Sequence, residues 1–224
     1  MLYQKVRPKT WDEVAGNASA VAALRDTGPG EAGKVYLLHG PSGTGKTTMA
    51  WLLAKDYGCS DGEMKTFSFN AATNSPAKLV KAVHDLACHL GFASPKIITL
   101  EEADCLSDHF QAQLLDVLDE SRQASIILCT TKPEKIIQSI KTRAVEVKVS
   151  GLTDEQMAGL LRNICQREQM QEPPESLMEK IIRRAEGSPR TALTLLENTV
   201  GKPVERAEAA LADTVSNQQE EGAL

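Results

Sequence analysis

The stretch Val35-Tyr36-Leu37-Leu38-His39-Gly40-Pro41-Ser42-Gly43-Thr44-Gly45-Lys46-Thr47 decides the fold of this 224-residue chain. Its first four residues are apolar and favour extended backbone, so they predict a buried strand. A loop of the pattern G-x-x-x-x-G-K-[ST] follows and leads into a helical stretch from Thr48 to Asp56. A strand, a glycine-rich loop and a helix in this order predict the start of an α/β domain.

The same loop has the composition of a phosphate-binding site. Its glycines let backbone N–H groups turn inward on phosphates, and the N-terminus of the following helix adds a positive dipole end. Lys46 can reach β- and γ-phosphates, and the Thr47 hydroxyl can ligate Mg²⁺. We therefore predict ATP or ADP with Mg²⁺ as ligands. The residues expected around the nucleotide are Gly40, Pro41, Ser42, Gly43, Thr44, Gly45, Lys46, Thr47 and Thr48. The alternative, a turn that binds nothing, is disfavoured by the strand before the loop and the helix after it.

Four more short β-branched runs alternate with helical patterns as far as Gly151. The runs are Phe67 to Phe69, Ile97 to Leu100, Ser125 to Cys129, and Val145 to Val149. Alternating strands and helices predict a mostly parallel sheet with helices on both faces. The strand signals then stop, so we expect an α/β domain over 1–151, a small all-α domain over 152–201, and a terminal helix with a disordered tail over 202–224.

The all-α part has clear helix boundaries in its sequence. Thr153 and Gln156 can form a capping box at the start of its first helix, and Pro173-Pro174 is expected to break that helix. Gly187 is expected to stop a second helix, and a third begins near Ser188-Pro189. A last helix is expected from Val204 to Val215.

Composition narrows the class of protein. No run of 18 apolar residues exists, and Met1-Leu2-Tyr3-Gln4-Lys5 lacks the order of a signal peptide, so we expect no membrane association and a cytoplasmic location. The five cysteines include no CxxC pair, which argues against a zinc site or a disulfide framework. A net charge of −5 argues against a surface that coats nucleic acid, so DNA contact would come from a local patch or from several copies.

A second chemical motif follows the strand Ile97 to Leu100. The residues Glu101-Glu102-Ala103-Asp104 would lie at the carboxyl end of that strand, where α/β sheets bind ligands. Glu101 is placed to hold Mg²⁺ or its waters, and Glu102 to polarise an attacking water. The alternative is an acidic, solvated loop, which the preceding phosphate loop makes less favoured.

These motifs together resemble the clamp-loader branch of the AAA+ ATPases. Glu101-Glu102-Ala103-Asp104 is similar to the family's Asp-Glu-Ala-Asp Walker B box. The segment from Lys5 to Asn17 is similar to the family's opening Lys-Tyr-Arg-Pro segment, which implies adenine contacts at Arg7 and Pro8. Phe69-Asn70-Ala71 is similar to the family's Leu-Asn-Ala, which implies that Asn70 acts as a polar switch on Glu102.

Three further matches follow in the family's order. The segment Ile127 to Ile137 resembles the sensor 1 strand and the helix after it, expected here over Glu134 to Ile140, with Thr131 where the family usually has Asn. Thr142-Arg143-Ala144 stands in the place of Ser-Arg-Cys, which implies that Arg143 is an arginine finger for a neighbouring subunit. Gly187 to Leu193 is similar to the sensor 2 helix, which implies that Arg190 reaches the γ-phosphate. The plain alternatives are a surface salt bridge for Arg143 and an exposed helix-start arginine at position 190.

The resemblance also implies partners. They are other clamp-loader subunits in a homo- or hetero-oligomer, a sliding clamp, and primer-template DNA. DNA phosphates would lie along the stretches Thr73 to Lys81, Ser107-Asp108 and Lys132 to Lys141. A solvated helix face is the alternative for the lysines in these stretches, and the four histidines show no metal spacing.

The sequence departs from the family at two places. Glu101 replaces an aspartate, so its carboxylate reaches one methylene further, and hydrolysis could be slow while binding persists. Only 24 residues follow Val200, too few for the family's collar domain, and the zinc module of bacterial clamp loaders is missing. The missing collar leaves two possibilities open, a chain from which the collar has been removed or a naturally short, phage-like relative. The missing zinc module favours the replication factor C small-subunit or phage type, the latter in a host-cell cytoplasm. Two other functions stay open: a nucleotide-gated binding protein with little hydrolysis, and another AAA+ DNA motor such as a branch-migration ATPase.

Overall fold

The computed structural model describes residues 1–27, 33–60, 68–89, 96–121 and 124–200, in two compact units. The sheet unit is Asn17–Val149, and the helical unit joins Met1–Gly16 to the chain from Ser150 onward. The division expected from the sequence assigns all of 1–151 to the sheet-containing domain. The first sixteen residues instead group with the helical unit, and the expected helix from Val204 to Val215 lies outside the described residues.

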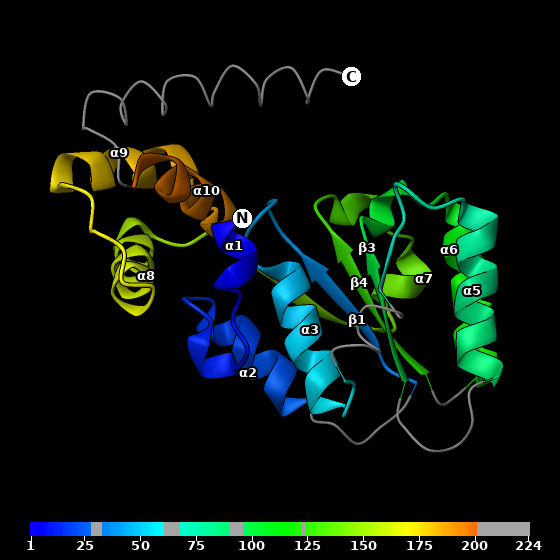
Figure 1. Ribbon diagram of the computed structural model, residues 1–224. Coiled ribbons are helices and arrows are strands. Elements are labelled where there is room, and N and C mark those ends of the chain that lie inside the picture. The colour runs from blue at the N-terminus through cyan, green and yellow to red at the C-terminus, as the bar shows by residue number, and fades with distance from the viewer. Residues whose placement is uncertain (28–32, 61–67, 90–95, 122–123, 201–224) are drawn as a thin grey trace. The chain divides into compact units, whose positions relative to one another are not determined.

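The sheet unit holds a five-stranded parallel sheet in the order β2-β3-β4-β1-β5 (Figure 1). The strands are β1 (Val35–His39), β2 (Ser68–Asn70), β3 (Lys96–Glu101), β4 (Ala124–Thr130) and β5 (Ala144–Lys148). The predicted fold class is confirmed, with strand boundaries within one or two residues of those expected, and Phe67 lies outside the described residues. Because β1 lies between β4 and β5, the phosphate-loop motif that follows β1 begins inside the sheet rather than at its edge.

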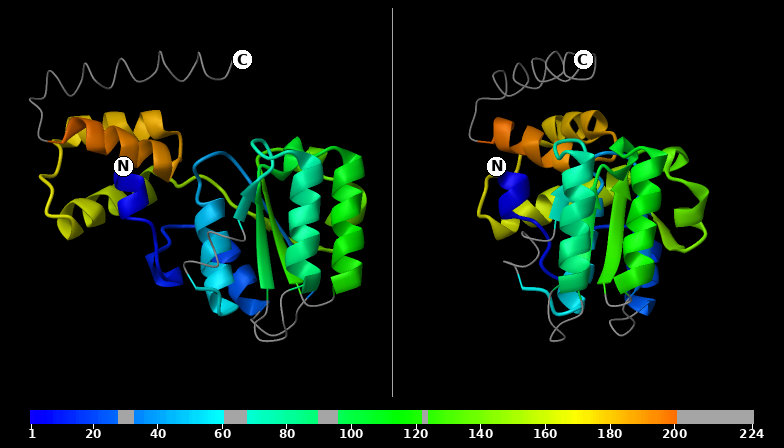
Figure 2. Two further views of the ribbon diagram at one scale, coloured as in Figure 1. Left: turned by 45° about the vertical axis from the view of Figure 1, so that its right-hand side comes forward. Right: turned by 90° about the vertical axis from the view of Figure 1, so that its right-hand side faces the viewer.

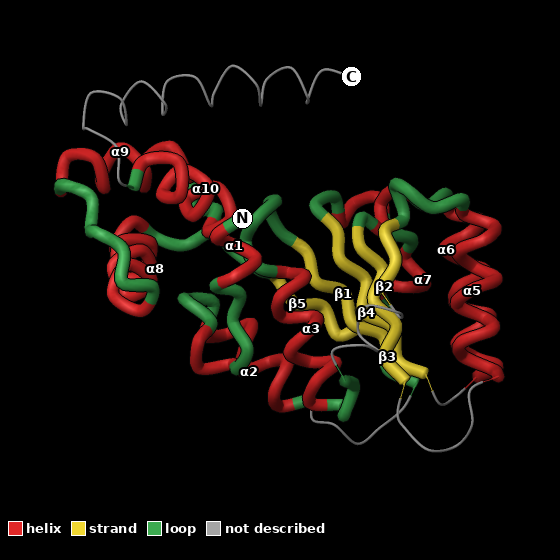
Figure 3. Tube along the Cα trace, viewed as in Figure 1, coloured by secondary structure: helices red, strands yellow, loops and turns green. Residues whose placement is uncertain are grey.

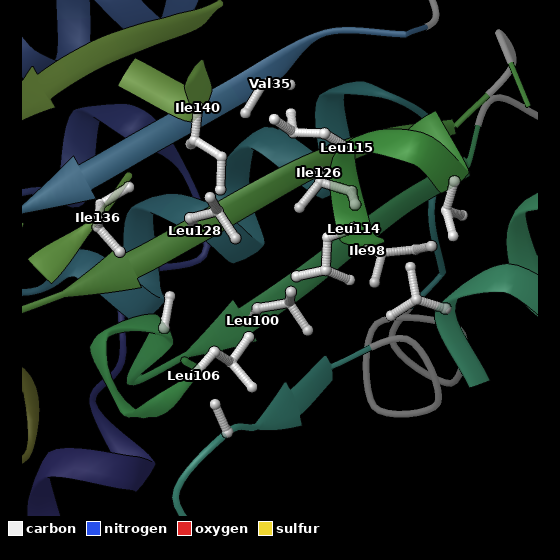
Figure 4. Packing of buried hydrophobic residues seen from close by; sticks show 14 of the residues in the cluster. Val35, Ile98, Leu100, Leu106, Leu114, Leu115, Ile126, Leu128, Ile136 and Ile140 are labelled. Atoms are coloured by element: carbon white, nitrogen blue, oxygen red, sulfur yellow. The ribbon is translucent and has the colours of Figure 1, made fainter. Parts of the chain in front are cut away.

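Helices cover both faces of this sheet, as Figures 2 and 3 show. On one face lie α2 (Ala18–Asp26) and α3 (Lys46–Asp56), and on the other lie α5 (Pro76–His89), α6 (Asp108–Ser121) and the short α7 (Gln138–Lys141). The strands alternate residues between the two faces. Leu37, Leu100 and Leu128 belong to the core under α5, α6 and α7, and Figure 4 shows their neighbours Leu114 and Ile140 in that cluster. All seven residues of β4 are buried, as expected for a central strand.

The helix expected over Glu134 to Ile140 is broken. A 3-10 turn, η3 (Pro133–Lys135), is followed by extended backbone at Ile136 and Ile137 before α7 begins. Gln111, 1% exposed, holds this break: its amide donates to the Lys135 carbonyl at 2.9 Å, and its carbonyl accepts from the Ile137 N–H at 3.0 Å. The backbone groups that a continuous helix would pair internally are thus satisfied by a buried side chain of α6.

The helical unit contains α8 (Asp154–Arg167), α9 (Glu175–Ala185) and α10 (Pro189–Thr199). The predicted capping box is confirmed, since Thr153 accepts from the Gln156 N–H and the Gln156 side chain accepts from the Thr153 N–H. The first helix ends at Arg167, earlier than the Pro173-Pro174 break expected from the sequence, with Gln169 in left-handed backbone just after it.

The chain's first residues belong to this unit because they contribute to its core. The short helix α1 (Leu2–Lys5) packs against α10, and Leu2 and Val6 are buried among the apolar residues of α8, α9 and α10. The Leu2 N–H donates to Glu197 of α10 at 2.9 Å, and Lys5 forms an ion pair with Glu168. A 3-10 turn, η1 (Trp11–Glu13), follows, and another, η2 (Ala103–Cys105), follows β3 in the sheet unit.

Candidate nucleotide site

The phosphate loop leaves β1 through Gly40, which only glycine can occupy. Its φ is 150°, and a Cβ built there would lie 1.9 Å from the carbonyl oxygen of Val149. The Gly40 N–H donates to the Thr130 carbonyl of β4, and the Val149 N–H donates to the His39 carbonyl of β1. The start of the loop is thus fixed between the carboxyl ends of two neighbouring strands.

The rest of the loop has the form of an anion cradle. Gly43 and Gly45 have φ values of 75° and 106°, and Gly45 is the N-cap of α3. A Cβ built on Gly45 would meet nothing within 4 Å, so there is open space beside this N-cap glycine. An open space at a helix N-terminus lined by backbone N–H groups suits a phosphate.

Lys46 lies over this loop. Its ammonium donates to the carbonyls of Gly40 at 2.8 Å and Pro41 at 2.7 Å, and the residue is 9% exposed. The Thr44 hydroxyl also donates to the Pro41 carbonyl, at 2.9 Å, which tightens the turn. The sequence thus supplies a buried cation whose stem is packed and whose head group lies within the loop.

The two residues predicted to hold Mg²⁺ meet in the structure. The Thr47 hydroxyl, in the first turn of α3, donates to Oε2 of Glu101 at the end of β3, at 2.9 Å. A hydroxyl beside a carboxylate, both oxygen donors next to a phosphate cradle, is the ligand chemistry that Mg²⁺ prefers. The donor set therefore fits a phosphate-bound Mg²⁺.

Asn70 and Glu102 lie at the same end of the sheet, where the parallel strands β2 and β3 have their carboxyl ends. Asn70 ends β2 and is the register partner of Glu101, so it lies one position from Glu102. Its side-chain oxygen accepts from the N–H groups of Ala72 and Thr73, which closes the turn after β2. Glu102 is exposed and has φ 55° and ψ 42°, a left-handed conformation that is uncommon for a glutamate and is often found at functional sites.

The predicted sensor residue Thr131 is exposed, whereas its neighbour Thr130 is buried and makes the polar contacts. The Thr130 hydroxyl donates to Asp104 at 2.6 Å and accepts from the Lys132 N–H at 2.9 Å. This pair links the turn after β3 to the turn after β4. Sequence reasoning missed Thr130 and Asp104, although the doublet of threonines at a strand end and an acid three residues after Glu101 were visible signals.

The thiol of Cys129 lies behind the site on β4. Complete burial, together with the nearby Glu101 carboxylate, raises the pKa of Cys129 well above its usual value. The thiol therefore stays protonated and uncharged at neutral pH and serves as a small apolar side chain. Cys59 and Cys165 are buried as well, while Cys105 is exposed.

Arg143 lies apart from the phosphate loop, in the turn between α7 and β5. Its side chain is 49% exposed and forms an ion pair with Asp119 of α6, with Nη1 at 2.9 Å and 2.8 Å from the two carboxylate oxygens. The ion pair that the sequence offered as the alternative is therefore present. This ion pair uses one of the three nitrogens of the guanidinium group.

Three of the predicted nucleotide contacts belong to the helical unit: Arg7, Pro8 and Arg190. Arg190 is exposed in the first turn of α10, and its guanidinium carbon lies 5.8 Å from the ring centre of Tyr3. The structure thus groups the opening segment with the predicted sensor 2 helix, a connection that the sequence did not indicate.

The geometry can be compared with known proteins. The profile of the ATPase family associated with various cellular activities (AAA) matches residues 36–152, over half of the chain. The chain belongs to the AAA family. The match spans the phosphate loop, the acidic strand end and Arg143 of this AAA protein.

Curated relatives indicate to which branch of the AAA family the chain is similar. The AAA chain is 28% identical to DNA polymerase III subunit tau of Escherichia coli, over 98% of the chain and 38% of the relative. It is 30% identical to replication factor C small subunit 2 of Pyrobaculum arsenaticum, over 90% of the chain and 64% of the relative, and 31% identical to replication factor C subunit 4 of Oryza sativa, over 88% and 60%. The resemblance to clamp-loader AAA+ ATPases is confirmed. Similar identities to bacterial and non-bacterial relatives do not support the preference for the non-bacterial branch.

Solved structures agree on the fold. The Holliday junction branch migration motor RuvB of Thermotoga maritima superposes with a TM-score of 0.64 at 19% identity, over 87% of this chain and 65% of that one. The AAA domain of FIGL-1 in complex with ADP superposes with a TM-score of 0.62 at 21% identity, over 86% and 73%. These identities are low, so the likeness shows the AAA fold and no more. Among the described residues, no helix has both the length and the apolar character needed to span a bilayer.

The Thr47–Glu101 contact yields a prediction about metal geometry. Changing Glu101 to Asp shortens the side chain by one methylene and should break the hydrogen bond from the Thr47 hydroxyl to this carboxylate. The hydroxyl oxygen of Thr47 and the shortened carboxylate can then both ligate a metal. We expect ATP turnover equal to or above that of the unchanged protein, because Mg²⁺ requires near-octahedral placement. Steady-state turnover across a Mg²⁺ titration measures this. A clear loss of turnover at saturating Mg²⁺ would show that the site is built around glutamate.

Proposed function

We propose that this AAA chain binds ATP or ADP with Mg²⁺ and hydrolyses ATP, as a subunit of a clamp-loader-type assembly acting in DNA replication. The observation that carries the proposal is the meeting of Thr47 and Glu101 at 2.9 Å beside a glycine loop with a buried lysine. The similarity to DNA polymerase III tau and replication factor C subunits supports the replication role. The chain spans 38% to 64% of these relatives' length, so the activity of the whole assembly belongs to the proposal.

Each residue has a proposed role. The loop N–H groups and Lys46 bind the β- and γ-phosphates, and Thr47 with Glu101 holds Mg²⁺, which when bound would offset phosphate charge. Glu102 accepts a proton from the attacking water, and Asn70, the register partner of the neighbouring Glu101, acts as a polar switch on Glu102. Thr131 orients the attacking water or the γ-phosphate through its hydroxyl, and the buried Thr130–Asp104 pair links the turns after β3 and β4. In the helical unit, Arg7 and Pro8 contact adenine and Arg190 reaches the γ-phosphate.

The proposed partners are other subunits, a sliding clamp and primer-template DNA. The helices α5 and α6 begin at Pro76 and Asp108, in two of the stretches expected to meet DNA phosphates, and α7 lies in the third. Ser107 stands at the N-cap position of α6, since the Gln111 N–H donates to its carbonyl at 3.0 Å. Helix N-termini with nearby lysines suit phosphates without reading base sequence.

Glu102→Gln is the test of the hydrolytic role. The amide keeps the size of the side chain but accepts no proton, so we expect ATP to bind as tightly as before while turnover falls by about 10²- to 10⁴-fold. Calorimetry with ATP and a phosphate-release assay, each with and without primed DNA, measure the two quantities. Glu179→Gln, an exposed glutamate in α9 outside the proposed nucleotide and DNA contacts, is the matched control and should leave both unchanged.

The outcomes separate the candidate functions. Unchanged turnover in Glu102→Gln would place the proton acceptor elsewhere, with Glu101 the next residue to test. ATP binding without turnover in the unchanged protein, even with DNA, would favour the nucleotide-gated binding protein over the motor. Stimulation by four-way junctions but not by primed templates would favour the branch-migration ATPase, for which the shared fold alone gives no preference.

A further inference from the structure

We propose that Asp119 is a positioning residue that fixes the guanidinium group of Arg143 for the nucleotide phosphates of a second copy of this chain. The inference rests on the proposed function, because it assigns a supporting residue to an arginine that acts between copies. It goes beyond that function in that neither the motifs nor the family resemblance gave Asp119 a role.

Hydrogen bonds and the burial of Ile140 hold the backbone that carries Arg143. The Arg143 N–H donates to the carbonyl of Ile140 at 3.1 Å, and the Thr142 N–H donates to the carbonyl of Gln138 at 3.0 Å, so both residues continue from the end of α7. Ile140 is 2% exposed within the core of the sheet unit. The turn is therefore anchored by burial, and the remaining freedom of Arg143 lies in its side chain.

The carboxylate of Asp119 removes much of that freedom. Asp119 lies near the end of α6, which packs against α7 as Figures 1 and 2 show. Both of its oxygens accept from the single nitrogen Nη1, at 2.9 Å and 2.8 Å. An arginine side chain loses rotamer entropy when it is ordered, so holding its guanidinium group in place reduces what a later contact must order.

For this positioning role, which nitrogen of Arg143 bonds to Asp119 matters more than the strength of the ion pair. With Nη1 directed at Asp119, neither Nε nor Nη2 bonds to any other residue in the described part of the sheet unit. Nε and Nη2 together form one of the forked edges with which arginine binds phosphate through two parallel hydrogen bonds. The side chains of Arg143 and Asp119 are 49% and 63% exposed, so the pair lies at the surface, where this edge can meet a ligand held by another copy.

The ion pair thus leaves the Nε–Nη2 edge of Arg143 available to a ligand rather than blocking it. A surface ion pair made through one nitrogen contributes little to stability, so stability alone gives no reason for this contact. If Asp119 instead sequestered Arg143, its removal would raise activity. The two roles therefore predict opposite changes in turnover.

The test compares Asp119→Ala with Asp116→Ala in the full-length chain. Asp116 is exposed one turn earlier on α6 and is the matched control for loss of a carboxylate from that helix. We expect Asp119→Ala to lower assembly-dependent ATP turnover by about 3- to 30-fold, a part of the 10³ to 10⁵ that an arginine finger supplies. Nucleotide affinity should not change, Asp116→Ala should behave as the unchanged protein, and Asp119→Glu should restore part of the rate.

A mixing experiment distinguishes positioning from a structural effect. Asp119→Ala protein mixed with Lys46→Ala protein should regain turnover, because copies that bind ATP then meet neighbours whose Arg143–Asp119 pair is intact. The double variant Asp119→Ala/Arg143→Ala should be no slower than Arg143→Ala alone. A further loss in the double variant, or a rise in turnover in Asp119→Ala, would overturn the proposal.

A spectroscopic measurement tests the geometry independently of turnover. In arginine side-chain ¹H–¹⁵N NMR spectra of the full chain, Arg143 should show slowed rotation of its Nη groups. That signature should disappear in Asp119→Ala and persist in Asp116→Ala. Free rotation in the unchanged protein would refute the pairing. If Arg143→Ala itself leaves assembly-dependent turnover intact, the proposed function fails, whereas an effect of Arg143→Ala without one of Asp119→Ala removes only this inference.

Discussion

Replacing Lys46 by alanine is expected to weaken ATP binding by about 100-fold or more. Lys46 is the cation built into the phosphate loop, and it is expected to make charge-assisted hydrogen bonds to both the β- and the γ-phosphate. Such bonds contribute about 1.5–3 kcal/mol each, and 1.4 kcal/mol corresponds to a factor of ten in affinity. Isothermal calorimetry of the full chain with ATP and Mg²⁺ measures the change.

The control for this result is Lys55→Ala, at the end of the same helix α3 and away from its N-terminus. It removes one positive charge from the same helix and should leave affinity unchanged. The substitution at Lys46 also removes its bonds to the carbonyls of Gly40 and Pro41, so thermal unfolding of both variants must be compared. Equal ATP affinity in Lys46→Ala and the unchanged protein would remove the nucleotide site from the proposal.

Arg143→Ala should abolish assembly-dependent turnover while leaving nucleotide affinity of the isolated chain nearly intact. Arg143 lies after α7, in a turn of its own rather than in the loop that carries Lys46, so we expect it to act on a neighbour's nucleotide. An arginine finger stabilises charge on the transferring phosphoryl group and is worth about 10³ to 10⁵ in rate. Phosphate release in the assembled state, with and without primed DNA, measures the loss.

Complementation decides whether this arginine acts between copies. Lys46→Ala protein keeps its Arg143 but lacks a nucleotide, and Arg143→Ala protein binds nucleotide but lacks the finger. A mixture should therefore recover part of the turnover that each variant has lost. If both variants assemble and the mixture stays inactive, or if Arg143→Ala weakens ATP binding in a monomer, Arg143 works within its own subunit or supports the fold.

Local sequence patterns predicted most of the sheet unit. The strands were recognised because β-branched runs such as Val35 to Leu38 and Ile97 to Leu100 are short, apolar and bounded by turns or loops. The helix after the phosphate loop and the capping box at Thr153 were recognised for a related reason, since loop and cap geometry depends on residues within about five positions. The helix α3 begins at Lys46, two residues before the expected start at Thr48. The one broken helix, at Ile136 and Ile137, was missed because a side chain from another helix, Gln111, holds the break.

What the sequence by itself determined is therefore the class of fold and the chemistry of the loop from Gly40 to Thr47, because these depend on neighbouring residues. The tertiary structure alone decided which distant groups meet. Thr47 reaches Glu101 across 54 positions, Thr130 pairs with Asp104, Asp119 holds Arg143, and the opening segment packs on α10 rather than in the sheet unit. Such contacts follow from strand order and helix packing, which depend on the burial of apolar surface over the whole unit and leave no local signal in the sequence.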